Sequence, residues 1–502
     1  MRRIRKKRRS GRLPGVLLLL LLFTVELCFC LLLAYTKFFQ MKYMLFIMAV
    51  SAGFAGVIYW MLSDINRRIR FVAGCFFMTV VIVAEGTGSF YIYRTAAALD
   101  SVTDINTETT EINIYVKKTS DAESLIDIES GTTGILKELD RDHTDRVLQQ
   151  LKYKTGVTFK TKEYPGLTEL SEGLLSGECD AVILNQAYLE VMRQMEQCGT
   201  FLEESRVLDT EQIQDVIERK INTGNKTNDG SEPGQSTHVY TIYLSGIDTR
   251  GEMTASSLSD VNIILTVNTK TKQILLVSTP RDYYVPLSIS GGVPDKLTHA
   301  GIYGVNVCID TLEMLYNMEI NYYFRINFAG FIKVIDALGG IEIQSDYEFN
   351  TQNARGYHFE KGSNYVNGEE ALAFCRERYS FAEGDRQRGR NQMYVIRGIL
   401  GKVMKGEFLK NYFSVLDSLE NCFETNVPYS LVSDLVQEQI KDQAKWSVLF
   451  YSADGTGDNQ KPYSMNQNAY VMIPDTDTVE KAELLMQKVR DDFLLSEADV
   501  AK

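Results

Sequence analysis

Three long apolar runs occupy the first part of the chain, at residues 15–35, 43–62 and 71–93. Their only charged residues are Glu26 and Glu85. About 20 consecutive apolar residues suffice to cross the hydrocarbon core of a bilayer. The pattern therefore predicts three transmembrane helices within residues 15–93. A cleaved signal peptide is the alternative for the first run, but that run is long, no small-residue cleavage site follows it, and two more spans come after it.

Basic residues lie on alternate sides of these runs. Eight of the first twelve residues are Lys or Arg, and three arginines lie between the second and third runs, against two lysines in the other loop. Loops rich in Lys and Arg face the cytoplasm. Residues 1–14 are therefore predicted to be a cytoplasmic basic tail, and everything after about residue 94 to be extracytoplasmic. Glu26 could be a functional intramembrane carboxylate, but a role in helix packing, or a protonated carboxyl without a function, is favoured.

Between residues 94 and 221, short apolar segments with a strand pattern alternate with segments that have a helix pattern. Period-two or continuous apolar runs predict strands at 112–116, 157–159 and 180–184, and amphipathic runs predict helices at 144–153 and 167–175. Alternating strands and helices indicate a small α/β accessory domain. A ligand-binding role and a spacer role both remain open for it. Residues 222–236 are rich in Asn, Thr, Gly and Ser, which predicts a linker before a second domain at 237–502.

Buried-type strands open this second domain, at 239–244, 261–267 and 274–278. Polar residues cluster where these strands begin or end: Asp248 follows the first, Asp260 precedes the second, and Arg281 and Asp282 follow the third. Ligands of open α/β sheets collect at strand ends. Helices are predicted at 368–379 and 393–404. The candidate site is therefore placed at these strand ends.

Charge and composition narrow the chemistry. The formal net charge is −12, although the tail is strongly basic, so the rest of the chain is more acidic than this total. Such an acidic chain is a poor general binder of nucleic acid. The chain has no GxxxxGK[ST] loop and no HExxH motif, and its four histidines are scattered. Cys179 and Cys198 are predicted to form either a disulfide in an oxidising exterior or a pair of buried free thiols.

Five arginines lie between residues 376 and 390 of this acidic domain. Arginine binds pairs of phosphate oxygens through its planar fork, so a converging set is typical of a pyrophosphate site. For Arg386 and Arg390 a surface salt bridge is the favoured interpretation. Asp248 and Asp260 beside such a site suggest Mg²⁺, although an Asp at a strand end is also common as a turn or helix cap. Outside the cytoplasm, a membrane-borne pyrophosphate is the expected ligand.

The second domain resembles the LytR-CpsA-Psr proteins of Gram-positive bacteria, and within them the streptococcal-type capsule-attachment subgroup. The resemblance rests on a series of motifs in order: GIDTR at 246–250, SD at 259–260, PRD at 280–282, DKLTHA at 295–300, ALGG at 337–340, RERY at 376–379, GD at 384–385, RGRNQ at 388–392 and the segment 470–475. The three spans and the small domain before the linker are also similar to that subgroup. The implied fold is an α/β/α catalytic domain with a mixed central sheet.

The resemblance implies a Mg²⁺-dependent phosphotransferase. Such an enzyme moves a capsular or other secondary wall polysaccharide from a polyprenyl-pyrophosphate carrier to peptidoglycan, at the C6 hydroxyl of N-acetylmuramic acid. Position by position, it assigns Asp248 and Asp260 to the metal and Asp282 to the general base. The implied pyrophosphate ligands are Arg281, Arg376, Arg378, Arg388, Gln392 and, more weakly, Lys296; among them Arg281 and Arg378 are also implied to be catalytic.

One departure and two alternatives accompany this assignment. Leu258 stands where many members have an arginine before the Ser-Asp pair, so one phosphate contact is absent or replaced. The segments 305–318 and 393–404 are apolar enough to line a lipid tunnel, but ordinary core is the simpler interpretation. A lipid-pyrophosphate hydrolase and a non-catalytic membrane receptor that regulates capsule expression remain as alternative functions.

Overall fold

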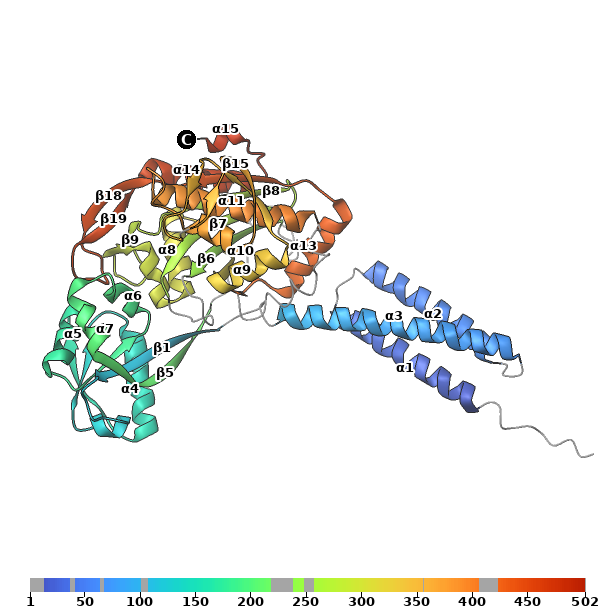
Figure 1. Cartoon of the computed structure of the whole chain (residues 1–502), viewed down its shortest axis with the longest axis horizontal. Coiled ribbons are helices and arrows are strands. Elements are labelled where there is room, and N and C mark those ends of the chain that lie inside the picture. Colours follow the sequence, from blue (N-terminus) through green and yellow to red (C-terminus); the bar gives the residue numbers. More distant parts are fainter. Residues whose placement is uncertain are drawn as a thin grey trace, which may run out of the picture. The chain divides into compact units, whose positions relative to one another are not determined.

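The computed structural model describes residues 13–36, 41–63, 67–100, 107–217, 238–247, 257–354, 356–405 and 423–501. The chain divides into two compact units (Figure 1). One comprises Met1–Ser101 with Tyr429–Asp442, and the other Val102–Pro428 with Gln443–Lys502. Each is described by itself.

Three helices make up most of the first unit: α1 (Leu13–Thr36), α2 (Met41–Leu62) and α3 (Arg68–Asp100). Two segments are long and apolar enough to cross a membrane, Met44–Leu62 and Arg68–Ala97, while α1 contains a shorter apolar stretch at Leu20–Tyr35. Large apolar side chains such as Phe23, Phe54 and Phe76 point outward. An apolar outer surface of this kind suits a lipid environment. The two long apolar helices, α2 and α3, suggest a membrane anchor.

A polar junction ties the three helices together. Ser51 of α2 lies within hydrogen-bond distance of two carboxylates, 2.8 Å from Glu26 Oε2 of α1 and 2.5 Å from Glu85 Oε1 of α3. Glu85 is buried inside the bundle. Glu26 therefore takes part in helix packing, which is one of the interpretations that the sequence favours.

The second unit begins with a five-stranded mixed sheet, which we call the five-stranded unit (residues 107–217). Its strand order is β3-β2-β4-β1-β5, with β2 parallel to both neighbours and β1 antiparallel to β4 and β5. The strands are β1 (Thr107–Lys117), β2 (Thr132–Leu136), β3 (Lys160–Tyr164), β4 (Ala181–Asn185) and β5 (Ser205–Val216). Its helices are α4 (Arg141–Thr155), α5 (Leu167–Ser176), α6 (Tyr188–Met192), α7 (Gly199–Glu204) and the 3-10 helices η1 (Leu125–Ile128) and η2 (Glu196–Cys198).

Helices cover both faces of this sheet. Leu170 and Leu174 of α5 pack with Tyr188 and Phe201 on one face, and Val147 and Leu151 of α4 pack on the other. The expected strand at 157–159 is wrong by a few residues, because the αL cap at Gly156 is followed by an irregular segment and the strand starts at Lys160. Cys179 and Cys198 are buried free thiols.

A six-stranded mixed sheet organises the rest of the second compact unit, residues 238–428 and 443–501, which we call the six-stranded unit. Its order is β16-β11-β6-β7-β8-β17, in which β11 runs parallel to β6 and β17 parallel to β8. The strands are β6 (Val239–Ile247), β7 (Ser259–Asn268), β8 (Gln273–Ser278), β11 (Tyr322–Asn327), β16 (Phe423–Thr425) and β17 (Ser447–Ser452). The three strands that the sequence predicts are therefore β6, β7 and β8 at the centre of this sheet.

Helices flank this sheet on both sides, as the α/β/α expectation requires. One face packs on α8 (Val305–Tyr316), α14 (Thr476–Arg490) and α15 (Glu497–Val500), and the other on α11 (Asp385–Met404). The segment 305–318 is ordinary core, since Val305, Cys308 and Leu312 are buried in the first face. The helix predicted at 368–379 is α10 (Gly368–Arg376), and the one predicted at 393–404 begins two turns earlier, at Asp385.

Smaller elements complete the six-stranded unit. Helices α9 (Phe328–Ala337) and α10 form a separate apolar cluster with a hairpin of β12 (Ile341–Ser345) and β15 (Gly362–Val366). Helix α13 (Tyr429–Asp442) belongs to the first compact unit. The other elements are β9 (Tyr284–Pro286), β10 (Pro294–Lys296), β13 (Phe349–Asn350), β14 (His358–Phe359), β18 (Gly455–Gln460), β19 (Ala469–Pro474) and the 3-10 helix η3 (Leu297–Tyr303).

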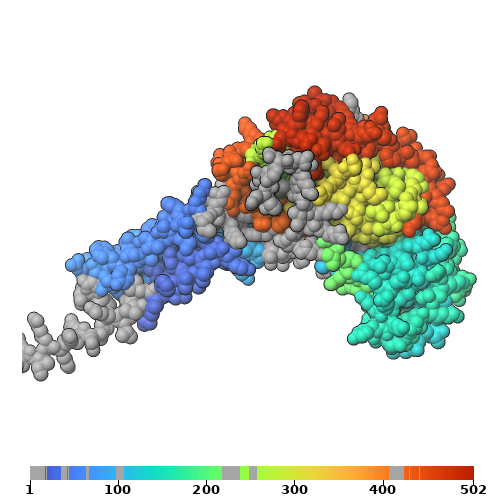
Figure 2. Space-filling view, turned by 180° about the vertical axis from the view of Figure 1, so that it is seen from behind, coloured from blue at the N-terminus to red at the C-terminus, as the bar shows by residue number. Residues whose placement is uncertain are grey.

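The five-stranded and six-stranded units pack directly on each other (Figure 2). Arg325 of β11 donates to Glu108 of β1 (2.6 Å) and to Glu424 of β16 (3.0 Å), and the guanidinium is almost completely buried. Glu108 also accepts from the Val305 backbone N–H at the start of α8, at 2.8 Å. A buried charged triad therefore joins the two sheets.

Candidate active site

The candidate site lies at one edge of the six-stranded sheet. Strands β6, β8, β11 and β17 all end at this edge, and antiparallel β7 starts there, since Ile247 at the end of β6 pairs with Ser259. The carboxyl ends of strands are where open α/β sheets bind their ligands. Asp260 at the start of β7 and the segment after β8 are therefore brought together by strand register alone.

A buried hydroxyl network supports the start of β7. Tyr243 of β6 donates to Asn262 Oδ1 (2.7 Å), and its oxygen also lies 2.8 Å from Ser259 Oγ. Ser259 lies 3.0 Å from Ser245 Oγ. All four side chains are buried, so their hydrogen bonds fix the backbone that presents Asp260.

Arg281 is the centre of the site. Its Nη1 donates to Asp260 Oδ1 at 2.7 Å, and its Nε lies 3.7 Å from Asp282 Oδ2. Burial by itself would lower the pKa of Arg281, but the charges of Asp260 and Asp282 outweigh it and raise that pKa. Its Nε is buried and makes no hydrogen bond within the described chain. Arg281 is thus a cation held in place by two carboxylates.

Two further residues extend the site along η3. Lys296 Nζ lies 3.4 Å from Asp282 Oδ1 and its side chain is largely buried. Thr298 Oγ1 lies 3.5 Å from Asp260 Oδ1, and its backbone N–H donates to the Arg281 carbonyl oxygen at 2.8 Å. Asp282 is therefore flanked by two cations, and Thr298 holds η3 against the Arg281 segment.

The first turns of α11 supply the opposite side of the site. Arg388 is buried and its Nη2 lies 2.6 Å from Asp385 Oδ1, one turn earlier on the helix. Burial lowers the pKa of Arg388; Asp385 opposes this shift, while the positive charges of Arg281 and Arg378 add to it. The charges of Arg281 and Arg378 thus both act on Arg388, and an anionic ligand would stabilise such a group of cations.

The remaining arginines differ in their surroundings. Arg378 lies over the Tyr379 ring, 4.7 Å from its centroid, and donates to the Tyr379 hydroxyl at 2.7 Å. Arg376 lies 4.5 Å from the centroid of the Phe328 ring at the start of α9. Gln392 lies one turn after Arg388 on α11 and is partly exposed. Their roles as pyrophosphate ligands stay predictions.

Arg386 and Arg390 take part in ion pairs, as the favoured interpretation for both expects. Arg386 binds Asp454 at 2.5 Å, and Arg390 binds Glu383 and lies 3.5 Å from Asp346. Asp454 follows β17, so Arg386 anchors the start of α11 to the sheet edge. Asp248 lies outside the described residues, so its assignment to the metal stays a prediction.

Three participants were not singled out from the sequence. Thr298 and Asp385 lie within motifs that the resemblance uses, and their contacts with Asp260 and Arg388 place them in the site. Tyr470 of β19 is the third. Burial and the charges of Asp282 and Asp385 raise its pKa. Its position depends on how β19 packs, for which the local sequence has no signal.

The carboxylates of the site are the feature that suits a divalent cation. Asp260, Asp282 and Asp385 set three carboxylates among the arginines, and this negative charge would oppose a diphosphate unless a cation offset it. Within the described residues, the one cluster of His and acidic ligand atoms spaced for a metal is elsewhere, at Glu348, His358 and Glu360, all exposed. Mg²⁺ therefore stays a proposal that rests on Asp260 and Asp248.

Comparison with known proteins decides the family. The family model described as the LytR_cpsA_psr family matches residues 206–488. The chain belongs to this family. Among family relatives, a protein of Bacillus anthracis named polyisoprenyl-teichoic acid–peptidoglycan teichoic acid transferase TagU is 36% identical over 222 residues, which cover 44% of this chain and 71% of the relative. A protein of the same name from Enterococcus faecalis is 36% identical over 192 residues, or 38% of this chain and 62% of that protein.

Two solved structures are also similar to this chain. B. subtilis TagV is 25% identical and covers 52% of this chain and 100% of its own, with a TM-score of 0.43. B. subtilis TagU is 27% identical and covers 51% and 99%, with a TM-score of 0.40. The family match thus includes β5, the whole six-stranded sheet and every described residue of the candidate site.

Gly301 in η3 offers a structural test of the site. A Cβ at this position would lie 2.2 Å from the Ser257 carbonyl oxygen and 2.9 Å from the Ser259 nitrogen, both backbone atoms beside Asp260. We expect Gly301→Ala to lower the free energy of unfolding by about 1–3 kcal/mol, since overpacking forces the backbone to move. Chemical unfolding of the full chain in detergent measures this change.

Gly401→Ala is the matched control. Nothing lies within 4 Å of a Cβ at Gly401, and this position is within α11. Alanine there should stabilise the protein by about 0.5–1 kcal/mol, because glycine is the poorer helix former. Equal stability of the two alanine variants would contradict the close packing of η3 on the start of β7.

Proposed function

We propose that the protein is a phosphotransferase that attaches a wall polysaccharide to peptidoglycan. The polysaccharide arrives on a polyprenyl-pyrophosphate carrier, and a capsular or other secondary wall polymer is the one we favour. The supporting observation is the convergence of Arg281, Arg388 and Lys296 with carboxylates at one sheet edge. The names of the family relatives describe the transfer of a polyisoprenyl-linked polymer to peptidoglycan, and they support the same class of reaction.

The proposed reaction needs mainly charge and position. A sugar hydroxyl of the glycan attacks the phosphorus next to the polymer, the bond from that phosphorus to the bridging oxygen breaks, and polyprenyl phosphate leaves. Arg281 and Arg388 hold the phosphate oxygens and offset the charge that develops on the leaving group. Asp282 accepts the hydroxyl proton, and Lys296 at 3.4 Å orients its carboxylate. A magnesium ion held by Asp260 and Asp248 would neutralise phosphate charge.

Reconstitution tests this function. Full-length protein in nanodiscs is given a polyprenyl-pyrophosphoryl oligosaccharide, Mg²⁺ and peptidoglycan glycan strands. Covalent sugar on the glycan supports the transferase. Release of phosphorylated sugar without transfer would support the hydrolase, and binding of the lipid without turnover would support the receptor. The same assay with chelator in place of Mg²⁺ tests the metal.

We further propose that α1 crosses the bilayer together with α2 and α3. Glu26, Ser51 and Glu85 each lie near the middle of their helix, so a three-span bundle brings them to one depth. Polar groups at membrane depth require such partners, because lipid offers none. This topology puts the basic tail in the cytoplasm and the candidate site outside.

Cysteine labelling tests the topology. In a chain whose native cysteines are replaced by serine, Ser10→Cys should react with a membrane-impermeant maleimide only after the cells are permeabilised. Ile126→Cys, at a side chain that is 69% exposed in the five-stranded unit, should react in intact cells. Labelling of both positions in intact cells would mean that only two helices span the membrane.

A further inference from the structure

A shallow, open groove runs along one side of the five-stranded unit. Five lining residues come from α4 and three from β5, and the volume is about 780 Å³. The α4 residues recur at the helical spacing of three and four, from Arg146 to Lys154, so they form one face of the helix. Nine helical residues span about 12 Å, which suits an extended ligand.

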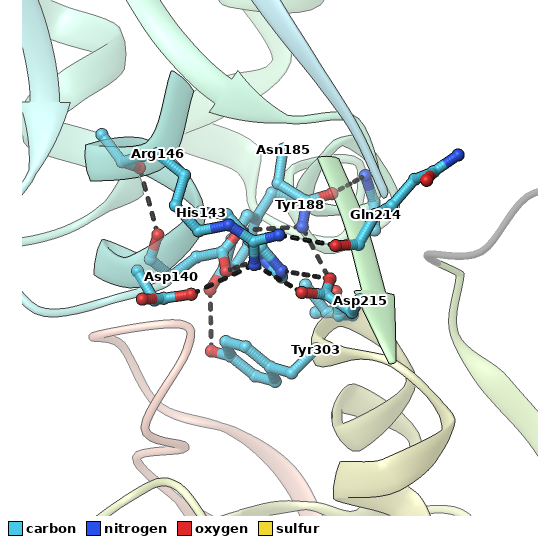
Figure 3. Close-up of polar contacts among 12 residues, drawn as sticks. Asp140, His143, Arg146, Asn185, Tyr188, Gln214, Asp215 and Tyr303 are labelled. Carbon is cyan, nitrogen blue, oxygen red and sulfur yellow. Dashed lines mark hydrogen bonds and ion pairs between the residues drawn. The ribbon is translucent and has the colours of Figure 1, made fainter. Parts of the chain in front are cut away.

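The wall of this groove is held by a buried charge cluster (Figure 3). His143 of α4 lies between two carboxylates, with Nδ1 2.5 Å from Asp140 and Nε2 2.8 Å from Asp215 of β5. Arg146, which lines the groove, binds Asp215 and donates to the Gln214 carbonyl oxygen at 2.6 Å. These contacts tie α4 to β5.

The cluster stays charged at neutral pH. Burial would lower the pKa of His143, but hydrogen bonds and charges from Asp140 and Asp215 outweigh it and raise that pKa to about 10. Both ring nitrogens therefore donate. The two ion pairs of His143 hold α4 against β5.

The same cluster connects the groove side of the unit to the segment that carries the candidate site. Asn185 donates to Asp140 at 2.8 Å and to the Ile302 carbonyl oxygen at 3.2 Å. Tyr188 donates to the Tyr303 hydroxyl at 2.7 Å (Figure 3). Ile302 and Tyr303 end η3, and the same helix contains Thr298, which contacts Asp260.

The side chains of the groove favour an uncharged, hydroxyl-rich ligand. Both cations are paired, Arg146 with Asp215 and Lys154 with Glu211 at 2.7 Å, so neither offers an open charge to a polyanion. Tyr153 is 95% exposed and presents its ring to solvent. Gln149, Gln150 and Gln212 are exposed, and no hydrogen bond within the described chain uses their amide groups. An aromatic ring beside free amides can stack on a sugar face and bind hydroxyl and acetamido groups.

We propose that the groove between α4 and β5 binds the acceptor, an N-acetylated glycan strand, and holds it on the molecule that carries the transfer site. This inference rests on the proposed function, which requires a glycan acceptor. Tyr153 supplies the stacking surface and the three glutamines supply amide contacts. The five-stranded unit is then an acceptor-binding module joined to the site through η3.

Binding of peptide-free peptidoglycan glycan strands to the full chain in nanodiscs tests the proposal. Tyr153→Ala and the double variant Gln149→Ala/Gln150→Ala should each weaken binding about tenfold, in line with the loss of a central aromatic or polar contact. Lys152→Ala is the matched control, because Lys152 is an exposed neighbour on α4 that does not line the groove. It should bind like the unchanged chain.

A second measurement separates this inference from the proposed function. In the transfer assay, Tyr153→Ala should raise the KM for glycan strands and leave kcat unchanged. If the unchanged chain transfers nothing but glycan binding still depends on Tyr153, the proposed function fails and the groove assignment stands. Unaltered glycan binding in both groove variants overturns the assignment, as does displacement of the strand from the groove by a poly(glycerol phosphate) polymer.

Discussion

Arg281→Ala should lower the rate of polymer transfer by about 100-fold or more. Removal of one preorganised donor from a charge-stabilising site commonly costs about 10²–10³ in rate. Arg281 is the residue that the site is built around, since its guanidinium bridges Asp260 and Asp282. Its loss leaves Asp260 facing the phosphates without its ion-pair partner and Asp282 with Lys296 alone. Steady-state transfer by full-length protein in nanodiscs measures the effect.

Two further variants show whether the loss of rate comes from the guanidinium group of Arg281. Arg281→Lys keeps the positive charge but loses the planar fork, so it should recover only part of the rate. Arg397→Ala is the control, because Arg397 lies on the same α11 helix as Arg388 but stacks on Tyr394 and Phe450. Its rate should be near that of the unchanged chain. A full rate in Arg281→Ala, with the protein folded, would remove Arg281 from the catalytic role.

Arg325→Ala should be the most destabilising single substitution proposed for this chain, by about 3–5 kcal/mol. Truncation of one partner in a buried ion pair leaves uncompensated charge in the interior. Here the guanidinium forms ion pairs with two carboxylates, Glu108 and Glu424. Burial raises the pKa of Glu424 even though the positive charge of Arg325 lowers it. The free energy of unfolding by denaturant measures the change.

A variant that lacks all three charges of the triad is the informative comparison with Arg325→Ala. Arg325→Met combined with Glu108→Gln and Glu424→Gln leaves no buried charge, so most of the lost stability should return. The triad would then act chiefly through charge balance at the junction between the two sheets. If Arg325→Ala costs less than about 1 kcal/mol, this junction is hydrated or differently packed.

Local pattern accounts for the elements that are rich in apolar residues. The centre of the six-stranded sheet could be predicted because β6, β7 and β8 each contain a mostly apolar segment bounded by polar residues. The start of α11 could not, because its first two turns, Asp385–Gln392, are polar and charged and hold Arg388 inward. Strand β5 was missed for a similar reason, since it is an edge strand with exposed polar side chains.

The site was predictable in part. Spacing and residue type singled out Asp260, Arg281 and Arg388, and strand register brings the first two together. Thr298 and Asp385 have a role through contacts between segments far apart in sequence, which a local pattern does not encode. The sequence favoured a salt bridge for Arg386 but did not identify Asp454 as its partner, since the two residues are far apart along the chain.

The most direct test of the central claim follows the phosphorus next to the polymer. The donor is labelled at this phosphate only and incubated with the full-length protein in nanodiscs, Mg²⁺ and glycan strands. We predict that the label becomes covalently bound to the glycan as a phosphodiester and that unlabelled polyprenyl phosphate is released in equal amount. Label found only on released polysaccharide phosphate, with none on the glycan, would contradict a phosphotransferase and favour hydrolysis.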